Sequence, residues 1–348
     1  MIEPRPTIRD VAARLGVSHT TVSLGLRNDP RIPSDTRRRV QEMAQAMGYR
    51  GNILVSALLS QVRKGRLANQ SEVVAVLVAQ PVSDWLSLPS MARGMESAHT
   101  RADELGLRLE VFSIGMRGQR ARQVGQVLRS RGYRAVLLPP LPTDLPPLRL
   151  DWSRFAVATL GYSFAQVELH RVANAHFNGI VTCYRELRKA GCERIGLVLT
   201  RDDDARARHY WSSGFMGAPL VHGGAALPPL LTGQTMDRRE FEIWFRNNRP
   251  DGIIGLSREV LPEWLDDMGV SVPDDVCYAC LDMIEGRGRA MAGIRQSWGD
   301  IFSMGVELVA GQLSRNEIGL PKSPTVTLID GTWHDGPTVA PRGTSRNR

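Results

Sequence analysis

A group of short polar side chains follows a glycine near the N-terminus, within the stretch VAARLGVSHTTVSLGL (residues 11–26). Its members are Ser18, His19, Thr20, Thr21 and Ser23. Hydroxyl and imidazole groups of this size can reach phosphates and base edges when their helix lies in the major groove of DNA. The residue types and their spacing therefore predict contact with a nucleic acid.

Two short helices are needed to present these side chains. A helix-turn-helix requires a small residue where the helices touch, a glycine with positive φ in the turn, and a branched apolar residue that locks the second helix. Ala12, Gly16 and Val22 fall at these three positions. The alternative is a small helical cap that serves dimerisation.

Capping residues predict three helices in this segment. Thr7 begins the first, with Asp10 in capping-box position, and Gly16 ends it. Ser18 caps the second helix and Ser34 caps the third. Apolar residues recur at helical spacing, and the expected buried faces comprise Ile8, Val11, Ala12, Leu15, Val22, Leu26, Val40, Met43, Ala44 and Met47.

Charge is unevenly distributed along the 348 residues. The first 66 residues contain 12 Lys and Arg but only 5 Asp and Glu, a net charge of +7 out of a total of +8. The remaining residues are therefore nearly neutral. A basic N-terminal segment is what binding to a polyanion requires.

From residue 73 onwards the pattern changes to strands that alternate with helices. Strand-like apolar runs such as VVAVLVA, AVLLPP and RIGLVLT are separated by helical segments, among them 89–105, 118–131, 205–216, 236–247 and 258–268. This alternation predicts parallel sheets covered on both faces. Two such series predict two α/β subdomains with a ligand cleft between them, at the carboxyl ends of the strands.

Composition excludes several classes of protein. No apolar run approaches the ~20 residues needed to cross a bilayer, and the start MIEPRPTIRD lacks a secretory apolar stretch, so we expect a cytoplasmic, nucleoid-associated protein without membrane contact. Cys277 and Cys280 form a C-x-x-C in an alternating strand-like run, where buried structural thiols are favoured over a redox motif or half of a zinc site. Catalytic motifs are also lacking, so we expect no enzyme activity, no metal and no cofactor.

The stretch TIRDVAARLGVSHTTVSLGLRNDPRIPSDTRRRVQEMAQAMGYRGN resembles the DNA-binding headpiece of the LacI/GalR family of bacterial transcription regulators. PDGIIGLSREVLPEWLDDMGVSVPDDVCYACLD and GIRQSW resemble parts of the effector domain of that family. The resemblance implies an all-α helix-turn-helix headpiece (1–50), a hinge helix and linker (51–69) and an α/β effector domain like periplasmic binding proteins (70–340). A disordered tail (341–348) is expected to follow.

The resemblance also implies roles for individual headpiece residues. His19 and Thr20 match base-reading positions, and Leu24 occupies a third such position that is usually Arg, so the preferred operator is expected to differ from the familiar one. Ser23 lies on the same face, and Arg27 stands where the family usually has Asn. Positions that contact the DNA backbone in the family are matched by Thr7, Ser18, Thr36, Tyr49 and Asn52.

In the resembled family, residues 52–60 form a hinge helix that orders on the operator. Leu58 matches the leucine that wedges into the minor groove. The alternative is that Leu54, Leu58 and Leu59 form only a packing stripe. Gly51 replaces the usual proline, which predicts a looser linker.

Effector-binding residues are expected on loops at the strand ends. Ala175 occupies a position where the resembled family often has an aspartate, so either His176 or Asn178 replaces it, or the ligand lacks a hydroxyl there. Asp282 can accept from sugar hydroxyls or, alternatively, cap a turn. The expected effector-binding residues are Trp85, His176, Arg206, Arg208 (one of these two arginines being the cleft arginine), Ser257, Asp282 and Trp298.

These features predict a regulator that binds double-stranded operator DNA as a homodimer, and the resemblance implies repression rather than activation. A small effector, expected to be a sugar, would control its DNA affinity allosterically. Two alternatives remain: a ligand-independent DNA-binding regulator with a degenerate pocket, and a sugar-binding carrier protein.

Overall fold

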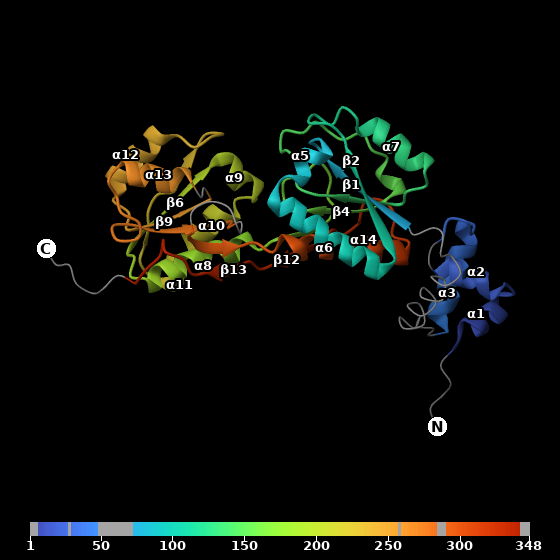
Figure 1. Cartoon of the computed structure of the whole chain (residues 1–348). Coiled ribbons are helices and arrows are strands. Elements are labelled where there is room, and N and C mark those ends of the chain that lie inside the picture. The colour runs from blue at the N-terminus through green and yellow to red at the C-terminus, as the bar shows by residue number, and fades with distance from the viewer. Residues whose placement is uncertain (1–5, 27–28, 48–71, 257–258, 284–289, 342–348) are drawn as a thin grey trace, which may run out of the picture.

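The computed structural model describes residues 6–26, 29–47, 72–256, 259–283 and 290–341 (Figure 1). Several residues singled out in the sequence lie outside these ranges. They are Arg27, Tyr49, Gly51, Asn52, Leu54, Leu58, Leu59 and Ser257, together with the expected hinge helix.

The N-terminal unit contains the three expected helices, α1 (Ile8–Leu15), α2 (His19–Leu26) and α3 (Ser34–Ala46). The capping box of Thr7 and Asp10 is present, and Gly16 ends α1 with a φ of 65°. Their small core consists of Val11, Ala12, Val22, Val40 and Ala44, all from the predicted faces. One expectation is wrong: Ser34 is the first residue of α3 rather than its cap, because Pro33 precedes it and no side chain caps the helix.

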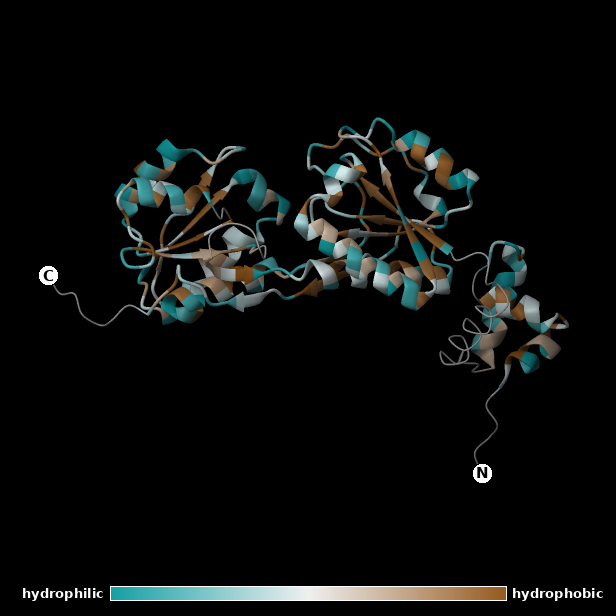
Figure 2. Ribbon diagram, viewed as in Figure 1, coloured by the Kyte–Doolittle hydropathy of each residue, from teal (hydrophilic) through white to brown (hydrophobic). Residues whose placement is uncertain are grey.

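The first α/β subdomain is built on a six-stranded parallel sheet of order β12-β5-β4-β3-β1-β2. Its strands are β1 (Glu72–Val78), β2 (Leu107–Ser113), β3 (Ala135–Leu138), β4 (Ala156–Leu160), β5 (His170–Asn174) and β12 (Val326–Ile329). The helices are α5 (Val82–Leu86), α6 (Pro89–Leu105), α7 (Ala121–Ser130) and α14 (Trp298–Arg315), with a 3-10 turn η1 (Trp152–Arg154). Apolar strands run through the middle of the layers, as expected for a sheet buried on both faces (Figure 2).

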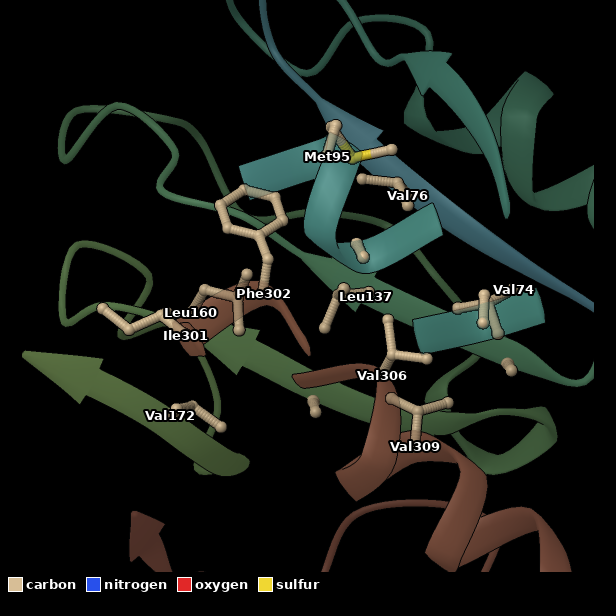
Figure 3. Close-up of a cluster of buried hydrophobic side chains, with 14 of the residues drawn as sticks. Val74, Val76, Met95, Leu137, Leu160, Val172, Ile301, Phe302, Val306 and Val309 are labelled. Carbon is tan, nitrogen blue, oxygen red and sulfur yellow. The ribbon is translucent and has the colours of Figure 1, made fainter. Parts of the chain in front are cut away.

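Helices α6 and α14 pack side by side on one face of this sheet. Phe302 of α14 and Met95 of α6 lie over Leu137 and Leu160 from the strands (Figure 3). The helices approach closely because Gly94 has no side chain: a Cβ atom there would lie 2.4 Å from the Phe302 ring. At the end of α14, the Asn316 side chain accepts a hydrogen bond from Arg134 (2.8 Å), which also pairs with Glu72 at the start of β1 (3.5 Å).

The second α/β subdomain has a seven-stranded sheet of order β13-β11-β10-β9-β6-β7, with β8 also paired to β6. Its strands are β6 (Arg194–Thr200), β7 (Ala225–Ala226), β8 (Leu230–Thr232), β9 (Gly252–Gly255), β10 (Cys277–Cys280), β11 (Ala292–Arg295) and the antiparallel β13 (Thr332–His334). The helices are α8 (His176–Lys189), α9 (Arg201–Arg206), α10 (Tyr210–Gly217), α11 (Pro219–His222), α12 (Arg238–Asn248) and α13 (Val260–Asp267). Cys277 and Cys280 are buried free thiols, as predicted.

The two subdomains are linked by crossings that lie far apart in sequence. Within the described ranges the chain crosses three times: from β5 to α8, from β11 to α14, and from β12 to β13. The first sheet therefore combines β1–β5 with the late strand β12, and the second combines β6–β11 with β13. A ligand held between the subdomains would contact the segments about which they can rotate.

The structure departs from the predicted elements in further places, and the sequence pattern assigned no strand to β7, β8, β11, β12 or β13. The single helix expected over 205–216 is two helices, α9 and α10, because Arg208 and His209 between them have φ values of 51° and 58°. Strand β5 lies in HRVAN, a stretch to which the sequence pattern assigned no strand. Among the described residues, no helix has the length and apolar character needed to cross a membrane.

Candidate nucleic-acid interface and ligand cleft

Helix α2 presents the polar face that the sequence predicts. The Ser18 hydroxyl accepts a hydrogen bond from the Thr21 backbone N–H (3.0 Å), which fixes the start of the helix. Val22 is fully buried against the other two helices. As a result, His19 and Thr20 in the first turn are exposed, whereas Ser23 and Leu24 are half-buried. The first turn can therefore meet another surface without any change in the helical core.

The other predicted backbone contacts lie at the starts of the neighbouring helices. Thr7 is exposed and holds the α1 cap, donating from its hydroxyl to the Asp10 carboxylate (2.7 Å). Hydrogen bonds from the Thr7 backbone and hydroxyl lower the pKa of Asp10. Thr36 is half-buried in the first turn of α3. Backbone N–H groups at helix starts favour nearby anions.

The arginines of this unit differ in whether they form ion pairs with neighbouring carboxylates. Arg38 pairs with both Asp35 (2.6 Å) and Glu42 (3.2 Å). Arg31 pairs with Asp29 (2.7 Å), and its hydrogen bond is the main cause that lowers the pKa of Asp29 to about 2. Three other exposed arginines have no ion pair among the described residues: Arg9, Arg14 and Arg39. These three are the arginines best placed to meet phosphates.

A cleft of about 680 Å³ lies between the two α/β subdomains. Its lining includes five of the predicted effector-binding residues: Trp85, His176, Arg206, Asp282 and Trp298. Trp85 comes from α5, His176 and Trp298 begin the helices α8 and α14 that follow two crossings, Arg206 ends α9, and Asp282 follows strand β10. Ser257 lies outside the described residues, although its neighbour Leu256 lines the cleft.

Of the two candidate arginines, Arg206 lines the cleft and Arg208 does not. The Arg206 guanidinium pairs with Asp203, which also accepts from the Thr200 hydroxyl (2.7 Å). The Arg208 side chain contacts residues of the first subdomain instead. Its guanidinium lies 5.5 Å from the centre of the Tyr162 ring and 3.9 Å from the Glu168 carboxylate.

The position of the missing family aspartate is occupied by the buried side chain of Ala175. Asn178 points away from the cleft, because its amide donates to Asp330 (2.8 Å) near the third crossing. His176 does line the cleft, with its ring 4.6 Å from the Trp211 ring. Burial, and to a lesser degree the charge of Arg206, lowers the pKa of His176 to about 4, so this imidazole is neutral at pH 7.

Sequence reasoning missed three amides that line the cleft: Gln80, Asn174 and Gln296. The Asn174 amide donates to the Gln296 side-chain oxygen (2.5 Å), and the Gln296 amide donates to the Leu281 carbonyl (3.2 Å). Only their positions directly after strands, at the sheet edge where ligands bind, could have pointed to Gln80, Asn174 and Gln296.

Three residues that line the cleft each have a buried polar atom without a hydrogen-bond partner among the described residues: Gln80 Oε1, Asn174 Oδ1 and Trp298 Nε1. Unsatisfied buried polar atoms are uncommon in folded proteins and are costly. No cluster of His, Cys, Asp or Glu among the described residues could hold a metal ion. The arrangement therefore fits an organic ligand held by hydrogen bonds and aromatic rings.

The described residues thus form a helix-turn-helix unit followed by two parallel-sheet subdomains around a cleft. Residues 7–52 match the family model described as "Bacterial regulatory proteins, lacI family". The N-terminal unit of this chain is thus similar to that of LacI-family transcriptional regulators.

Relatives and solved structures agree with this assignment. The regulator DegA of Bacillus subtilis is 31% identical over 127 residues, which cover 36% of this chain and 34% of DegA. GalS of Salmonella typhimurium is 46% identical over 56 residues, or 16% of each chain. The matched parts thus span well under two thirds of these two relatives.

Two solved structures share the fold over nearly the whole chain. The transcriptional regulator CelR in complex with cellobiose has a TM-score of 0.62 at 18% identity, covering 96% of this chain and all of that one. The lac repressor dimer bound to operator and the anti-inducer ONPF has a TM-score of 0.58 at 16% identity, covering 97% and 100%. The predicted combination of a helical headpiece and two parallel-sheet subdomains is therefore confirmed.

Proposed function

We propose that this protein is a transcriptional regulator that binds double-stranded operator DNA as a homodimer and changes its DNA affinity when a small ligand, a sugar, occupies the cleft. Repression is the direction that we propose. One headpiece makes too few contacts for specific binding, so two headpieces would occupy two half-sites of a pseudopalindromic operator.

The observation that carries this proposal is the exposed first turn of α2, with His19 and Thr20 at its surface and Val22 locked beneath. In our proposal His19, Thr20 and Leu24 read base edges, with Ser23 beside them. Leu24 can contact a thymine methyl group but cannot form the bidentate pair that arginine makes with guanine.

Further residues complete the proposed interface. Contacts to the DNA backbone are assigned to Thr7, Ser18, Thr36, Tyr49 and Asn52, an additional contact to Arg27, and insertion into the minor groove to Leu58. A segment over 51–69 would act as the hinge between the headpiece of residues 1–50 and the domain of residues 70–340. Electrostatic attraction by the +7 segment would add affinity that falls as salt rises.

For the cleft, a sugar is supported by its aromatic walls and by structural neighbours. The half-buried Trp298 offers an apolar ring and Asp282 a carboxylate, whereas Trp85 is only 1% exposed and packs against Phe302. A LacI-family regulator from Weissella paramesenteroides, with a TM-score of 0.55, was solved with bound glucose. We assign ligand contacts to His176, Arg206, Asp282 and Trp298, with Ser257 as a further candidate. Arg208 is proposed to bridge the subdomains instead.

A ligand-independent regulator is the second candidate, because Ala175 removes the carboxylate that the family often places in the cleft. The unpartnered atoms of Gln80, Asn174 and Trp298 favour a ligand over an empty cleft.

The test is selection of DNA sequences from a random duplex library by the purified full-length protein, followed by binding measurements at several salt concentrations. We expect enrichment of a pseudopalindromic site, a dimer in analytical ultracentrifugation, and affinity that falls steeply with salt. A monomer that ignores DNA even in dilute salt would overturn the proposal. Regulation without ligand would be indicated if no small molecule changed the affinity for the selected site.

A further inference from the structure

The buried amide of Asn174 lines the cleft where the chain first crosses from one subdomain to the other. It ends strand β5 at the first crossing between the subdomains, and the residue is only 4% exposed. Its Oδ1 atom has no hydrogen-bond partner, although the side chain lines the cleft. A ligand group that donates a hydrogen bond to such a buried acceptor removes the cost of leaving it unsatisfied, so the bond adds to the binding free energy.

The orientation of this amide follows from its neighbours. The carbonyl of Leu281 can only accept a hydrogen bond, so Gln296 must direct its NH₂ group there (3.2 Å) and its oxygen towards Asn174. Asn174 must then direct its own NH₂ group to that oxygen (2.5 Å), because two oxygens cannot share a hydrogen bond. Oδ1 of Asn174 is thereby fixed as the free atom.

Two further buried atoms in the lining also lack a hydrogen-bond partner, which a ligand could supply. Gln80 Oε1, just beyond strand β1, is a second buried acceptor without a partner, and Trp298 Nε1, at the start of α14, is a buried donor without one. A matching ligand has at least two donating groups and one accepting group. Hydroxyl groups can do both, whereas carboxylates and phosphates at neutral pH mainly accept.

We infer that the cleft selects an uncharged ligand whose hydroxyl or N–H group donates to Asn174 Oδ1, and that it discriminates against sugar acids and sugar phosphates. Asn174 determines this specificity by direct contact, and Gln296 is a positioning residue that holds the Asn174 amide. The inference rests on the proposed function, since it specifies the ligand of the same cleft. Arg206 in the lining is already paired with a neighbouring carboxylate, so the carboxylates of Asp144 and Asp202 in the same lining add repulsion to an anionic ligand.

This arrangement also couples the ligand to the crossings. Asn174 and Gln296 lie on two of the three crossings, and Leu281 belongs to the second subdomain. A donor bound at Oδ1 would therefore strengthen a chain of hydrogen bonds that runs from one subdomain to the other.

The experiment measures binding to the full-length protein by calorimetry, with uncharged probes and their anionic counterparts. The uncharged probes are D-glucose, D-ribose and cellobiose. The anionic probes are D-glucuronate, glucose 6-phosphate and ribose 5-phosphate. We expect at least one uncharged probe to bind, and to bind about tenfold or more tightly than its anionic counterparts.

Variants test the residues directly with the tightest uncharged probe. Asn174→Leu should weaken binding about tenfold or more, and Asn174→Asp, which keeps an acceptor, should weaken it less. Gln296→Leu should also weaken binding, because the Asn174 side chain is then free to rotate. In the Gln296→Leu background, the affinities of Asn174→Leu and Asn174→Asp should differ less than they do in the wild-type background. Asn178→Leu is the matched control, since that amide faces Asp330. Its affinity should equal that of the wild type.

Tighter binding of an anionic probe, or unchanged affinity in folded Asn174→Leu, would overturn this inference and leave the proposed ligand control standing. Failure of every probe to bind would contradict both the inference and the sugar part of the proposed function. DNA selection is measured separately, so the regulator assignment would then stand or fall on its own result. Melting curves of each variant establish that it is folded, and Asn174→Asp provides the test if Asn174→Leu does not fold.

Discussion

In the N-terminal unit, His19 and Thr20, which we assign to base contacts, stand exposed in the first turn of one short helix, and the residues beneath them are apolar. In the cleft, the polar atoms are buried and come from elements more than 200 residues apart, from Gln80 to Trp298. The base-reading turn of α2 is held in place by one small folding unit. The cleft exists only when both subdomains and their crossings are assembled, so the two regions should respond differently to mutation.

The largest expected effect separates the two regions. Val22→Asp places a charge without a partner in the small core of the headpiece and should unfold it, at a cost of at least about 3 kcal/mol. DNA binding should be lost, while calorimetry should show unchanged melting of the α/β subdomains. The matched control is Gln45→Asp at an exposed position of α3, which should leave the headpiece folded. Loss of cleft stability in Val22→Asp would mean that the units are not independent.

A second substitution probes the opposite region. The buried Gln312 side chain of α14 accepts from the Val157 backbone N–H (2.8 Å) and donates to its carbonyl (3.0 Å). Gln312→Leu leaves both groups without partners and should destabilise the first subdomain by about 2–4 kcal/mol. Gln126→Leu, at an exposed position of α7, is the control with the same change of residue. Equal melting temperatures for both variants would contradict the structural role of Gln312.

The buried, neutral His176 in the cleft predicts that the free energy of unfolding depends on pH. Its pKa is about 4 in the folded protein and near 6.5 when unfolded, so the unfolded chain binds more protons between these values. Stability should therefore fall by about 2 kcal/mol as the pH drops from 6.5 to 4. His176→Gln should lose this part of the dependence, and His99→Gln, which is exposed, should keep it. Denaturant unfolding at several pH values measures the difference.

A change in base preference tests the exposed surface. Leu24→Arg supplies a group that can form a bidentate pair with guanine, so binding to sites with guanine at the matching position should improve by about 1–3 kcal/mol. Thr20→Ala should likewise alter which sequences are preferred. Repeating the library selection with each variant measures both changes. Identical selected sites for wild type and both variants would show that α2 does not read the bases.

The smallest effect is expected for Arg38→Ala. Because this guanidinium already pairs with Asp35 and Glu42, the substitution should weaken binding only slightly and by the same factor on every DNA sequence. The slope of log affinity against log salt should change by no more than about 1. Arg39→Ala, which removes an arginine without an ion pair, should have the larger effect in the same titration.

The headpiece could be predicted from sequence in almost all its detail, because its caps, turn glycine and apolar spacing are local. Continuous apolar runs likewise predicted strands such as β1 and β6. Strand β5 escaped because His170 and Arg171 interrupt its apolar character. Arg171 is nevertheless buried, since its guanidinium donates to the carbonyls of Gly161 (2.5 Å) and Phe164 (3.0 Å).

The split between α9 and α10 was equally hidden from local patterns. A buried carboxylate, Asp204, accepts from the Ser212 backbone N–H (3.1 Å) and hydroxyl (2.7 Å) and lies 2.9 Å from the His209 ring. These contacts hold the left-handed turn that separates the helices. In the cleft, aromatic and charged residues near strand ends were identifiable by type. The role of Asn174 depends on its contact with Gln296, which is 122 residues away and leaves no pattern in the sequence.

Helix α14 has a mechanical consequence. Its 18 residues start at Trp298 in the cleft and end beside Arg134 and Glu72, where the chain enters its first strand from the DNA-binding end. A rod of this kind is about 27 Å long, so a tilt of about 5° caused at one end would displace the other by about 2 Å. A shift of the Trp298 indole ring at one end of the helix would therefore be carried across the first subdomain to Arg134 and Glu72 at the other end.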